Sequence, residues 1–108
     1  MLDDTDVKVE VYLPHEYIEP MLASLTEIGA CIVGAYDHVS SYAPVEGTWR
    51  PLPGSRPFHG ETGVLCHAEE YKLEFRCSRE RIKSAVAAIR RIHPYEEPVI
   101  NIIPLLSL

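Results

Sequence analysis

Three groups of side chains in this sequence are of types that bind ligands or move protons. The first is Tyr36-Asp37-His38, in which a carboxylate stands beside an imidazole. An aspartate next to a histidine can orient the ring, help to hold a metal ion or simply cap a turn. This group indicates either a ligand site or a hydrogen-bonded network at the start of a loop, and both alternatives stay open.

The second group is the run from His93 to Pro98, in which two prolines enclose an aromatic ring and two carboxylates. Prolines reduce the conformational entropy of the chain, so a site built here would be preorganised. One interpretation is a rigid turn, with His93 favourably placed at a helix C-terminus. The other is a fixed platform that presents His93 and Glu96 to a cleft, with Tyr95 between them.

The third group is His59, Cys66 and His67, followed by Glu69 and Glu70. These side chains could supply soft and hard metal ligands, but they lack the spacing of a structural metal centre. Neighbouring residues of a strand point to opposite faces, so Cys66 and His67 do not converge easily on one ion. The sequence also has no Cys-x-x-Cys pair of the kind that binds zinc. We keep His59 as a candidate ligand contact only.

Positive charge is scarce in the middle of the chain, where Arg50 and Arg56 are the only cations between Lys8 and Lys72. They are either the contacts of an anionic ligand or exposed loop charges. Phosphate-binding loops, nucleophile elbows and zinc-protease helices have sequence motifs that are all missing here. An enzyme is the last-ranked class, because neither a nucleophile nor an orienting triad is evident.

The composition narrows the classes of protein. The chain has 108 residues, 46% of them hydrophobic, which predicts one domain with one core. Its 16 acidic and 10 basic residues give a net charge of -6, which disfavours nucleic-acid binding. No apolar run approaches the roughly 20 residues that span a bilayer. The three widely spaced cysteines are typical of buried thiols in a reducing compartment, so we expect a soluble, cytoplasmic protein.

The elements that must position these groups begin with residues 7–13, where apolar and polar residues alternate as in a half-buried strand. Residues 15–28 change to a helical period, and Gly29 supplies the stop. Residues 30–35 are short and apolar, which favours a second strand. Residues 36–63 hold four prolines and four glycines and no regular period, which predicts one long, functional loop.

The second half of the chain repeats this order. Alternation returns over 69–77, an amphipathic helix follows from an N-cap at Ser78 to the residue before Pro94, and 99–103 form a last apolar strand. The order β-α-β-β-α-β predicts an α+β ferredoxin-like plait, an antiparallel sheet with both helices on one face. Residues 1–6 form a flexible lead-in, and residues 7–108 form a single domain that contains the long loop 36–63.

Four ordered motifs carry a family resemblance: Gly-Ala-Tyr-Asp-His-Val-Ser at 34–40, Gly-Thr-Trp-Arg-Pro-Leu at 47–52, Gly-Ser-Arg-Pro-Phe-His-Gly-Glu-Thr-Gly at 54–63, and His-Pro-Tyr-Glu-Glu-Pro at 93–98. With this spacing the chain resembles, over about 7–105, the YqfO-type domain. That is the PII/CutA-like domain inserted in many NGG-interacting-factor-like dinuclear-metal proteins, also found free-standing. The last motif is similar to one in CutA, the divalent-cation-tolerance protein.

The resemblance implies a PII/CutA-like plait that assembles as a trimer, with clefts between subunits that bind small effectors. It also implies a metal-binding role for His93 and Glu96, which match the CutA motif. We include His38 as a third candidate ligand. The cofactor would be a divalent cation such as Cu or Zn. The dinuclear site of the larger proteins lies in their flanking domain and is not carried over. Ala35 and Val39 stand where the family commonly has Asn and Cys.

The leading hypothesis is therefore a small oligomeric binding or regulatory module that holds a small ligand or a divalent cation near inter-subunit clefts. Its candidate ligand contacts are Tyr36, Asp37, His38, Arg50, Arg56, His59 and Tyr95. The alternative is a structural or partner-binding assembly protein with no small-molecule ligand. We expect a homo-oligomer, with a small molecule or a protein as partner, and neither nucleic acid nor membrane.

Overall fold

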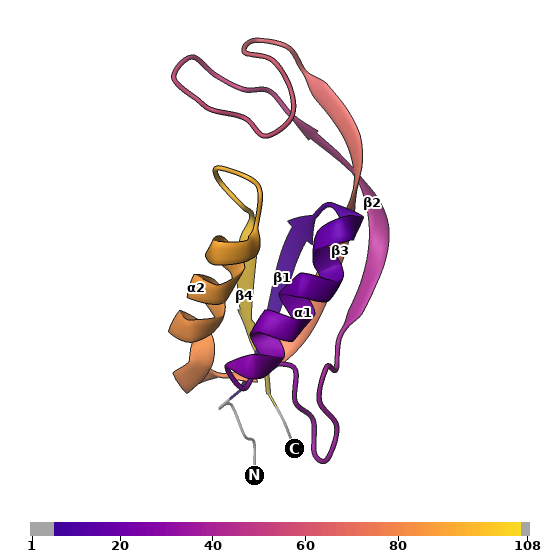
Figure 1. The fold of residues 1–108 in the computed structure, drawn as a ribbon, viewed down its shortest axis with the longest axis vertical. Helices are drawn as coiled ribbons and strands as arrows, with labels where there is room; N and C mark the ends of the chain where they lie inside the picture. Colours follow the sequence, from indigo (N-terminus) through magenta and orange to yellow (C-terminus); the bar gives the residue numbers. More distant parts are fainter. Residues whose placement is uncertain (1–5, 107–108) are drawn as a thin grey trace.

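A computed structural model describes residues 6–106 of the chain (Figure 1). The elements are β1 (Asp6–Leu13), α1 (Ile18–Glu27), β2 (Ser41–Trp49), β3 (Cys66–Ser78), α2 (Ile82–Ile92) and β4 (Ile100–Pro104), with short 3-10 turns at His15–Tyr17 and Arg79–Arg81. The strands form one antiparallel sheet in the order β2-β3-β1-β4, and both helices cover the same face of that sheet. This confirms the predicted plait. The predicted lead-in lies outside the described residues, except for Asp6, which opens β1.

The core forms where the helix-facing side of the two central strands meets the helices. Val9 pairs with Phe75 and Val11 with Leu73, and all four side chains are buried. The alternation in the sequence predicts this face because residues two apart on a strand point the same way. The helices contribute a matching apolar stripe, made of Ile18, Met21, Leu25, Ala85, Ala88 and Ile89.

The helix ends follow local chemistry, with one correction. Pro20 is the third residue of α1, within the first turn, where a missing N–H costs no helical hydrogen bond. Gly29, at φ +92°, ends the helix in the left-handed region that glycine adopts most readily. Ser78 takes the predicted N-cap position, at the 3-10 turn that leads into α2, but its hydroxyl is buried and makes no cap hydrogen bond.

The second strand lies elsewhere than predicted. Residues 30–35 are not a strand: they enter a loop with one isolated bridge between Val33 and Tyr36. The strand is β2, inside the segment 36–63 predicted as one long loop. It divides that segment into an irregular stretch before β2 and the connection 50–65 after it. Pro44 and Gly47 disfavour a strand locally, and β2 is mostly exposed. Its pairing with β3 overrides that local preference.

The β2–β3 hairpin extends well beyond the helices, and the connection 50–65 curls back from its end (Figure 1). The molecule therefore measures 50 × 25 × 23 Å, with a radius of gyration of 15.2 Å. A compact chain of this length has a radius of gyration of about 13 Å. The excess is the hairpin, which packs against little else in a single copy.

The open face of the sheet carries a network of opposite charges. Lys8 Nζ lies 2.6 Å from Glu74 Oε2, and Lys72 Nζ lies 3.3 Å from Glu10 Oε2. Hydrogen bonds from Asn101 and then Lys72 lower the pKa of Glu10, and Lys8 lowers that of Glu74. These charged side chains are the polar members of the alternation in residues 7–13 and 69–77. Within residues 6–106, neither helix is long and apolar enough to cross a membrane.

We expect Leu25→Ala to lower the free energy of unfolding by about 2–5 kcal/mol, because it opens a cavity in the core. Leu25 is 0% exposed, whereas Leu22 of the same helix is half-buried and serves as the matched control. Urea unfolding followed by circular dichroism measures both. Equal losses for the two variants would contradict the packing described.

Candidate functional site

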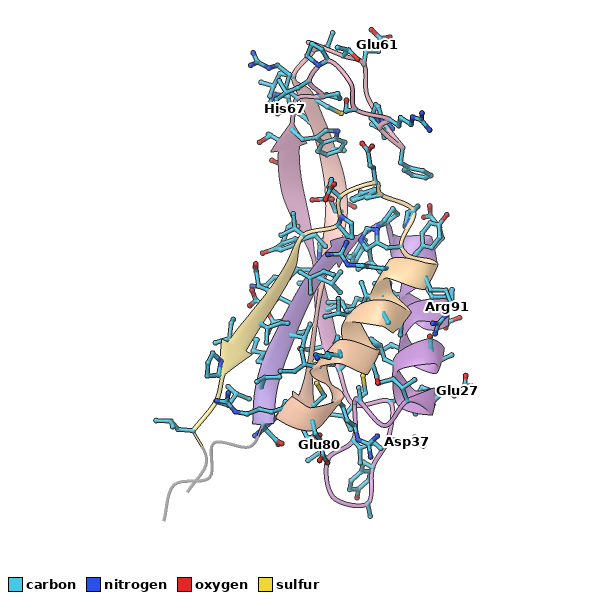
Figure 2. The ribbon with its side chains drawn as sticks, turned by 90° about the vertical axis from the view of Figure 1, so that its left-hand side faces the viewer. Glu27, Asp37, Glu61, His67, Glu80 and Arg91 are labelled. Carbon is cyan, nitrogen blue, oxygen red and sulfur yellow. The ribbon has the colours of Figure 1, made fainter. Side chains whose placement is uncertain are left out.

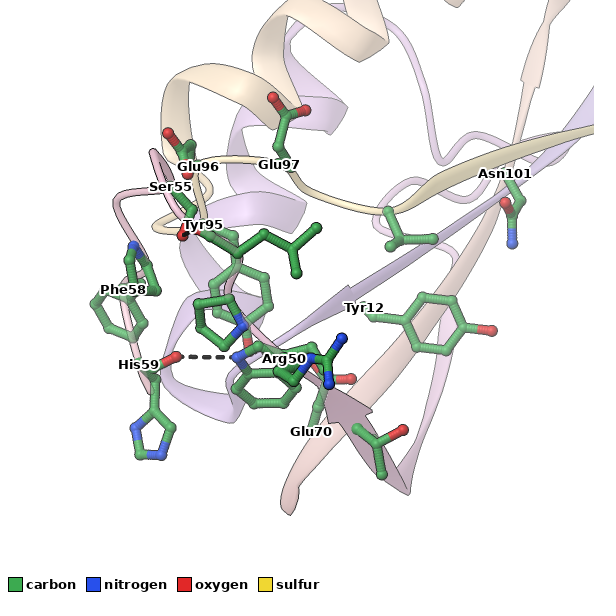
Figure 3. Close-up of a pocket in the computed structure, with 17 residues that line it drawn as sticks. Tyr12, Arg50, Ser55, Phe58, His59, Glu70, Tyr95, Glu96, Glu97 and Asn101 are labelled. Atoms are coloured by element: carbon green, nitrogen blue, oxygen red, sulfur yellow. Dashed lines mark hydrogen bonds between the residues drawn. The ribbon is translucent and has the colours of Figure 1, made fainter. Parts of the chain in front are cut away.

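A pocket of about 660 Å³ lies between the connection 50–65, the turn 93–98 and one end of the open sheet face (Figure 3). Its polar lining comes from several elements: Tyr12 of β1, Glu70 of β3 and Asn101 of β4 all face it from the sheet. The connection supplies Arg50, and the turn supplies Tyr95 and two further carboxylates. Segments far apart in the sequence therefore share one hollow.

Hydrogen bonds hold the connection 50–65 in this position. The indole Nε1 of Trp49 donates to the carbonyl oxygen of His59 at 3.0 Å, which is the dashed line in Figure 3. The Gly63 amide donates to the Pro51 carbonyl at 2.8 Å and closes the loop on itself. The Arg56 amide donates to Glu96 Oε1 at 2.8 Å and ties the connection to the turn 93–98.

Aromatic rings form the apolar wall of the pocket. The Tyr95 ring stands between Trp49 and Phe58, with centroid distances of 6.4 and 5.9 Å, and the His59 ring lies 5.9 Å from Trp49. Phe58 is 54% exposed, so the wall is open on one side. Such a wall offers stacking surface to a flat or apolar ligand.

Glu70 brings a carboxylate to the base of this wall. The Tyr95 hydroxyl donates to Glu70 Oε1 at 3.0 Å. Burial, and then Glu70, raises the pKa of Tyr95, so its hydroxyl stays protonated and donates. A side chain at residue 47 would collide with Glu70 Oε2, so Gly47 is the residue that leaves room for the carboxylate.

The buried side chain of His93, which is 8% exposed, holds the turn 93–98 in place. Its Nδ1 accepts the Tyr95 amide at 3.2 Å, and its Nε2 lies 2.7 Å from the Tyr12 carbonyl oxygen. Because a carbonyl only accepts, Nε2 carries the proton and the ring is neutral. Burial lowers the pKa of His93, which favours the same neutral form.

The predicted site residues fall into two groups in one copy of the chain. Arg50, His59, Tyr95 and Glu96 line the pocket, and Arg56 contacts Glu96 through its backbone amide. The other group lies at the opposite end of the molecule, where Figure 2 labels Asp37. There Tyr36 and Asp37 line a smaller hollow, and His38 Nδ1 lies 3.0 Å from Asp37 Oδ1.

The predicted metal ligands His38, His93 and Glu96 are not brought together within one chain. His38 is in the loop at one end of the molecule, whereas His93 and Glu96 are in the turn at the other. Both ring nitrogens of His93 are already engaged by backbone groups. Among the described residues no three His, Cys, Asp or Glu side chains are grouped for a metal ion.

Sequence reasoning considered Glu70 only as a possible metal ligand beside Cys66 and His67, did not place it in a pocket, and gave no role to Trp49. Glu70 belongs to the outward face of an alternating strand, where a carboxylate is usually solvated. Two signals could have found this part of the site. The first is the single tryptophan of the chain, which follows Gly47 closely. The second is the pairing of β2 with β3, which brings Gly47 near Glu70. The second signal needs the position of β2, which the sequence does not mark.

Comparisons with known proteins give relatives of one kind. No family model matches the chain. The chain is 37% identical over 98 residues to the GTP cyclohydrolase 1 type 2 homolog of Bacillus subtilis, covering 91% of this chain and 26% of that protein. It is 34% identical, over the same shares, to the homolog of Halalkalibacterium halodurans. The chain thus spans about a quarter of the length of these curated relatives.

Solved structures agree on the fold. A Bacillus cereus protein related to NIF3 superposes with a TM-score of 0.81 at 27% identity, over 97% of this chain and 28% of that one. The periplasmic divalent cation tolerance protein CutA from Archaeoglobus fulgidus gives 0.69 at 16% identity, over 93% and 83% of the two chains. B. subtilis GlnK gives 0.63 at 17% identity, over 93% and 84%. The last two share the fold alone.

We expect the free energy of unfolding to fall as the pH is lowered from about 7 to about 5. The folded protein holds His93 neutral, while the unfolded chain takes up a proton near the ordinary pKa of 6.5, so acid favours unfolding. Glu10 and Glu74, whose pKa values are lowered, lose their contribution only below the ordinary 4.5.

Urea unfolding at several pH values measures this dependence. His93→Gln should flatten it, while His67→Gln, at an exposed site outside the turn, should leave it unchanged. An NMR titration that places the His93 pKa above 6.5 would contradict the explanation.

Proposed function

We propose that this chain is a small oligomeric module that binds a small organic ligand. It is a PII/CutA-like domain of the YqfO type, and it matches about a quarter of the length of the GTP cyclohydrolase 1 type 2 homologs. The ligand lies in the pocket between the connection 50–65 and the turn 93–98. The observation that carries the proposal is the pocket itself, with an aromatic wall and a few fixed polar groups. Ligand sites have this size and this mixture of surfaces.

The protruding hairpin supports an oligomer. A two-stranded hairpin with little else to pack on is only marginally stable in water. Here Tyr42 on β2 is 50% exposed, and Ile102 and Ile103 on the opposite edge strand β4 are each 39% exposed. Neighbouring copies that cover these surfaces would stabilise both edges, and the trimer that the family resemblance implies is the assembly we propose.

An oligomer would also give the two groups of candidate residues a common role. The loop 31–40, which carries Asp37, lies at one end of a copy, whereas the connection 50–65 that lines the pocket lies at the other (Figures 1 and 2). They can act on one ligand only if a neighbouring copy brings its loop 31–40 to the pocket. We include this contact in the proposal.

An organic ligand is preferred over Cu or Zn for a specific reason. A metal at His93 would have to displace the Tyr95 amide from Nδ1 or break the bond to Tyr12. Either change releases the turn that carries the pocket. The three free cysteines fit a reducing compartment, so we place the module in the cytoplasm.

The assembly alternative, without any ligand, remains the competing function. It attributes the ordered connection 50–65 to packing between subunits. The two functions differ in what happens at Trp49, which is the only tryptophan and stands in the pocket wall. If the pocket binds a ligand, an added ligand changes the fluorescence emission of Trp49. If the protein serves assembly alone, no added compound is expected to change that emission.

We expect light scattering after size-exclusion chromatography to give three times the mass of the 12.2 kDa chain, independent of dilution over the micromolar range. The reason is that the hairpin and both sheet edges lack sufficient packing in one copy. A stable monomer would contradict the oligomer and with it the contact between loop 31–40 and the pocket.

We expect small aromatic compounds to change Trp49 emission, and Phe58→Ala to weaken their binding about two- to tenfold through the loss of stacking. Leu65→Ala is the matched control: Leu65 is also an exposed apolar residue of the connection, but it does not line the pocket. Tyr36→Ala should weaken binding only if the loop 31–40 of one copy reaches the pocket of a neighbouring copy. If no compound changes the emission, the assembly alternative is favoured.

A further inference from the structure

Glu70 is a polar group of the pocket with contacts at both of its carboxylate oxygens. One carboxylate oxygen accepts the Tyr95 hydroxyl, and the other occupies the space above Gly47. The residue is half-buried, and within residues 6–106 no ion pair joins it to a cation. A carboxylate held in a pocket by a neutral hydroxyl keeps its negative charge uncompensated, and a cationic donor would compensate it best.

The rest of the pocket lining is, like Glu70, mainly negatively charged. The pocket contains three carboxylates, of Glu70, Glu96 and Glu97, against the single guanidinium of Arg50. Glu96 is partly occupied, because it accepts the Arg56 amide. The electrostatic potential in a hollow lined mainly by carboxylates attracts positive charge.

The aromatic wall adds a second attraction for positive charge. The Tyr95 ring bears the hydroxyl that holds Glu70, and the Trp49 ring stands 6.4 Å from it. The faces of such rings attract ammonium groups, most strongly for tryptophan. A cation bound to Glu70 would therefore lie near both rings.

We propose that the pocket selects a small organic cation, a primary ammonium group on a flat apolar body, whose N–H groups donate to Glu70 while the body stacks on the aromatic wall. This inference rests on the proposed function, since it names the class of ligand for the same pocket. It also defines the role of Gly47, which leaves the carboxylate its place.

The test compares three probes of one size and different charge: benzylammonium, benzyl alcohol and benzoate. Each is titrated into the full chain while Trp49 emission is recorded, and NMR shifts of the pocket residues locate the binding. We expect benzylammonium to bind about tenfold or more tightly than the other two, which is the contribution of a hydrogen bond to a charged group.

Glu70→Gln removes the charge but keeps an oxygen for the Tyr95 hydroxyl, so it should abolish the preference for the cation. Glu69→Gln is the matched control, because it changes the net charge equally from the neighbouring position, which points to the other face of β3 and lies outside the pocket. Gly47→Ala keeps every charge but displaces the Glu70 carboxylate, so it should also weaken the binding of benzylammonium.

The outcomes separate this inference from the proposed function. Preference for benzylammonium that is lost in Glu70→Gln and kept in Glu69→Gln supports it. Equal binding of the three probes, a preference for benzoate through Arg50, or a preference that survives Glu70→Gln overturns it and leaves the binding module standing. Failure of all three probes to bind the wild-type pocket overturns both. The comparison of probes on the wild-type chain holds even if a variant does not fold.

Discussion

The pairing of β3 with two different strands is the constraint on which the rest of the structure depends. Residues 71–78 of β3 pair with β1 and build the core, while residues 66–74 pair with β2 and form the hairpin. A strand of 13 residues reaches about 43 Å, which is longer than either helix. The excess length carries the connection 50–65 past the helices to the level of the turn 93–98. The pocket exists because one continuous strand belongs both to the core and to the hairpin.

His93 links the core to the pocket. Its imidazole is bound to the end of β1 through the Tyr12 carbonyl and to the turn through the Tyr95 amide. Tyr95 in turn positions Glu70 on β3. A neutral, buried histidine can make both bonds, because it has one donor and one acceptor. The prolines at 94 and 98 then restrict the turn around this anchor. The turn is therefore rigid, but of the two side chains that the platform interpretation presents to a cleft only Glu96 lines the pocket, because His93 is buried and bound to backbone groups.

The sequence predicts the elements that bury one face and fails for the one that does not. β1 and β3 alternate clearly, because half of their residues meet the core. β2 has no such pattern: its residues are mostly exposed, and it contains Pro44 and Gly47. The apolar run 30–35 resembles a strand because Ala30 and Cys31 are buried, yet it turns away after Cys31, whose φ is +62°. The candidate site shares this limit, since Glu70 acquires its partners only through the position of β2 and the turn.

Binding and assembly should be coupled in this architecture, for a geometric reason. The pocket is not separate from the open sheet face: Tyr12 and Asn101 line it, and Asn101 also donates to Glu10 within the charged network. A neighbouring copy placed on that face would cover part of the pocket lining as well. A ligand that contacts both copies would bind the assembled form more tightly than a single copy, so it would stabilise the assembly by the same free energy that assembly adds to its binding. In the proposed assembly, regulation by a small molecule would need no moving part in the chain, because a neighbouring copy would complete the half-open pocket.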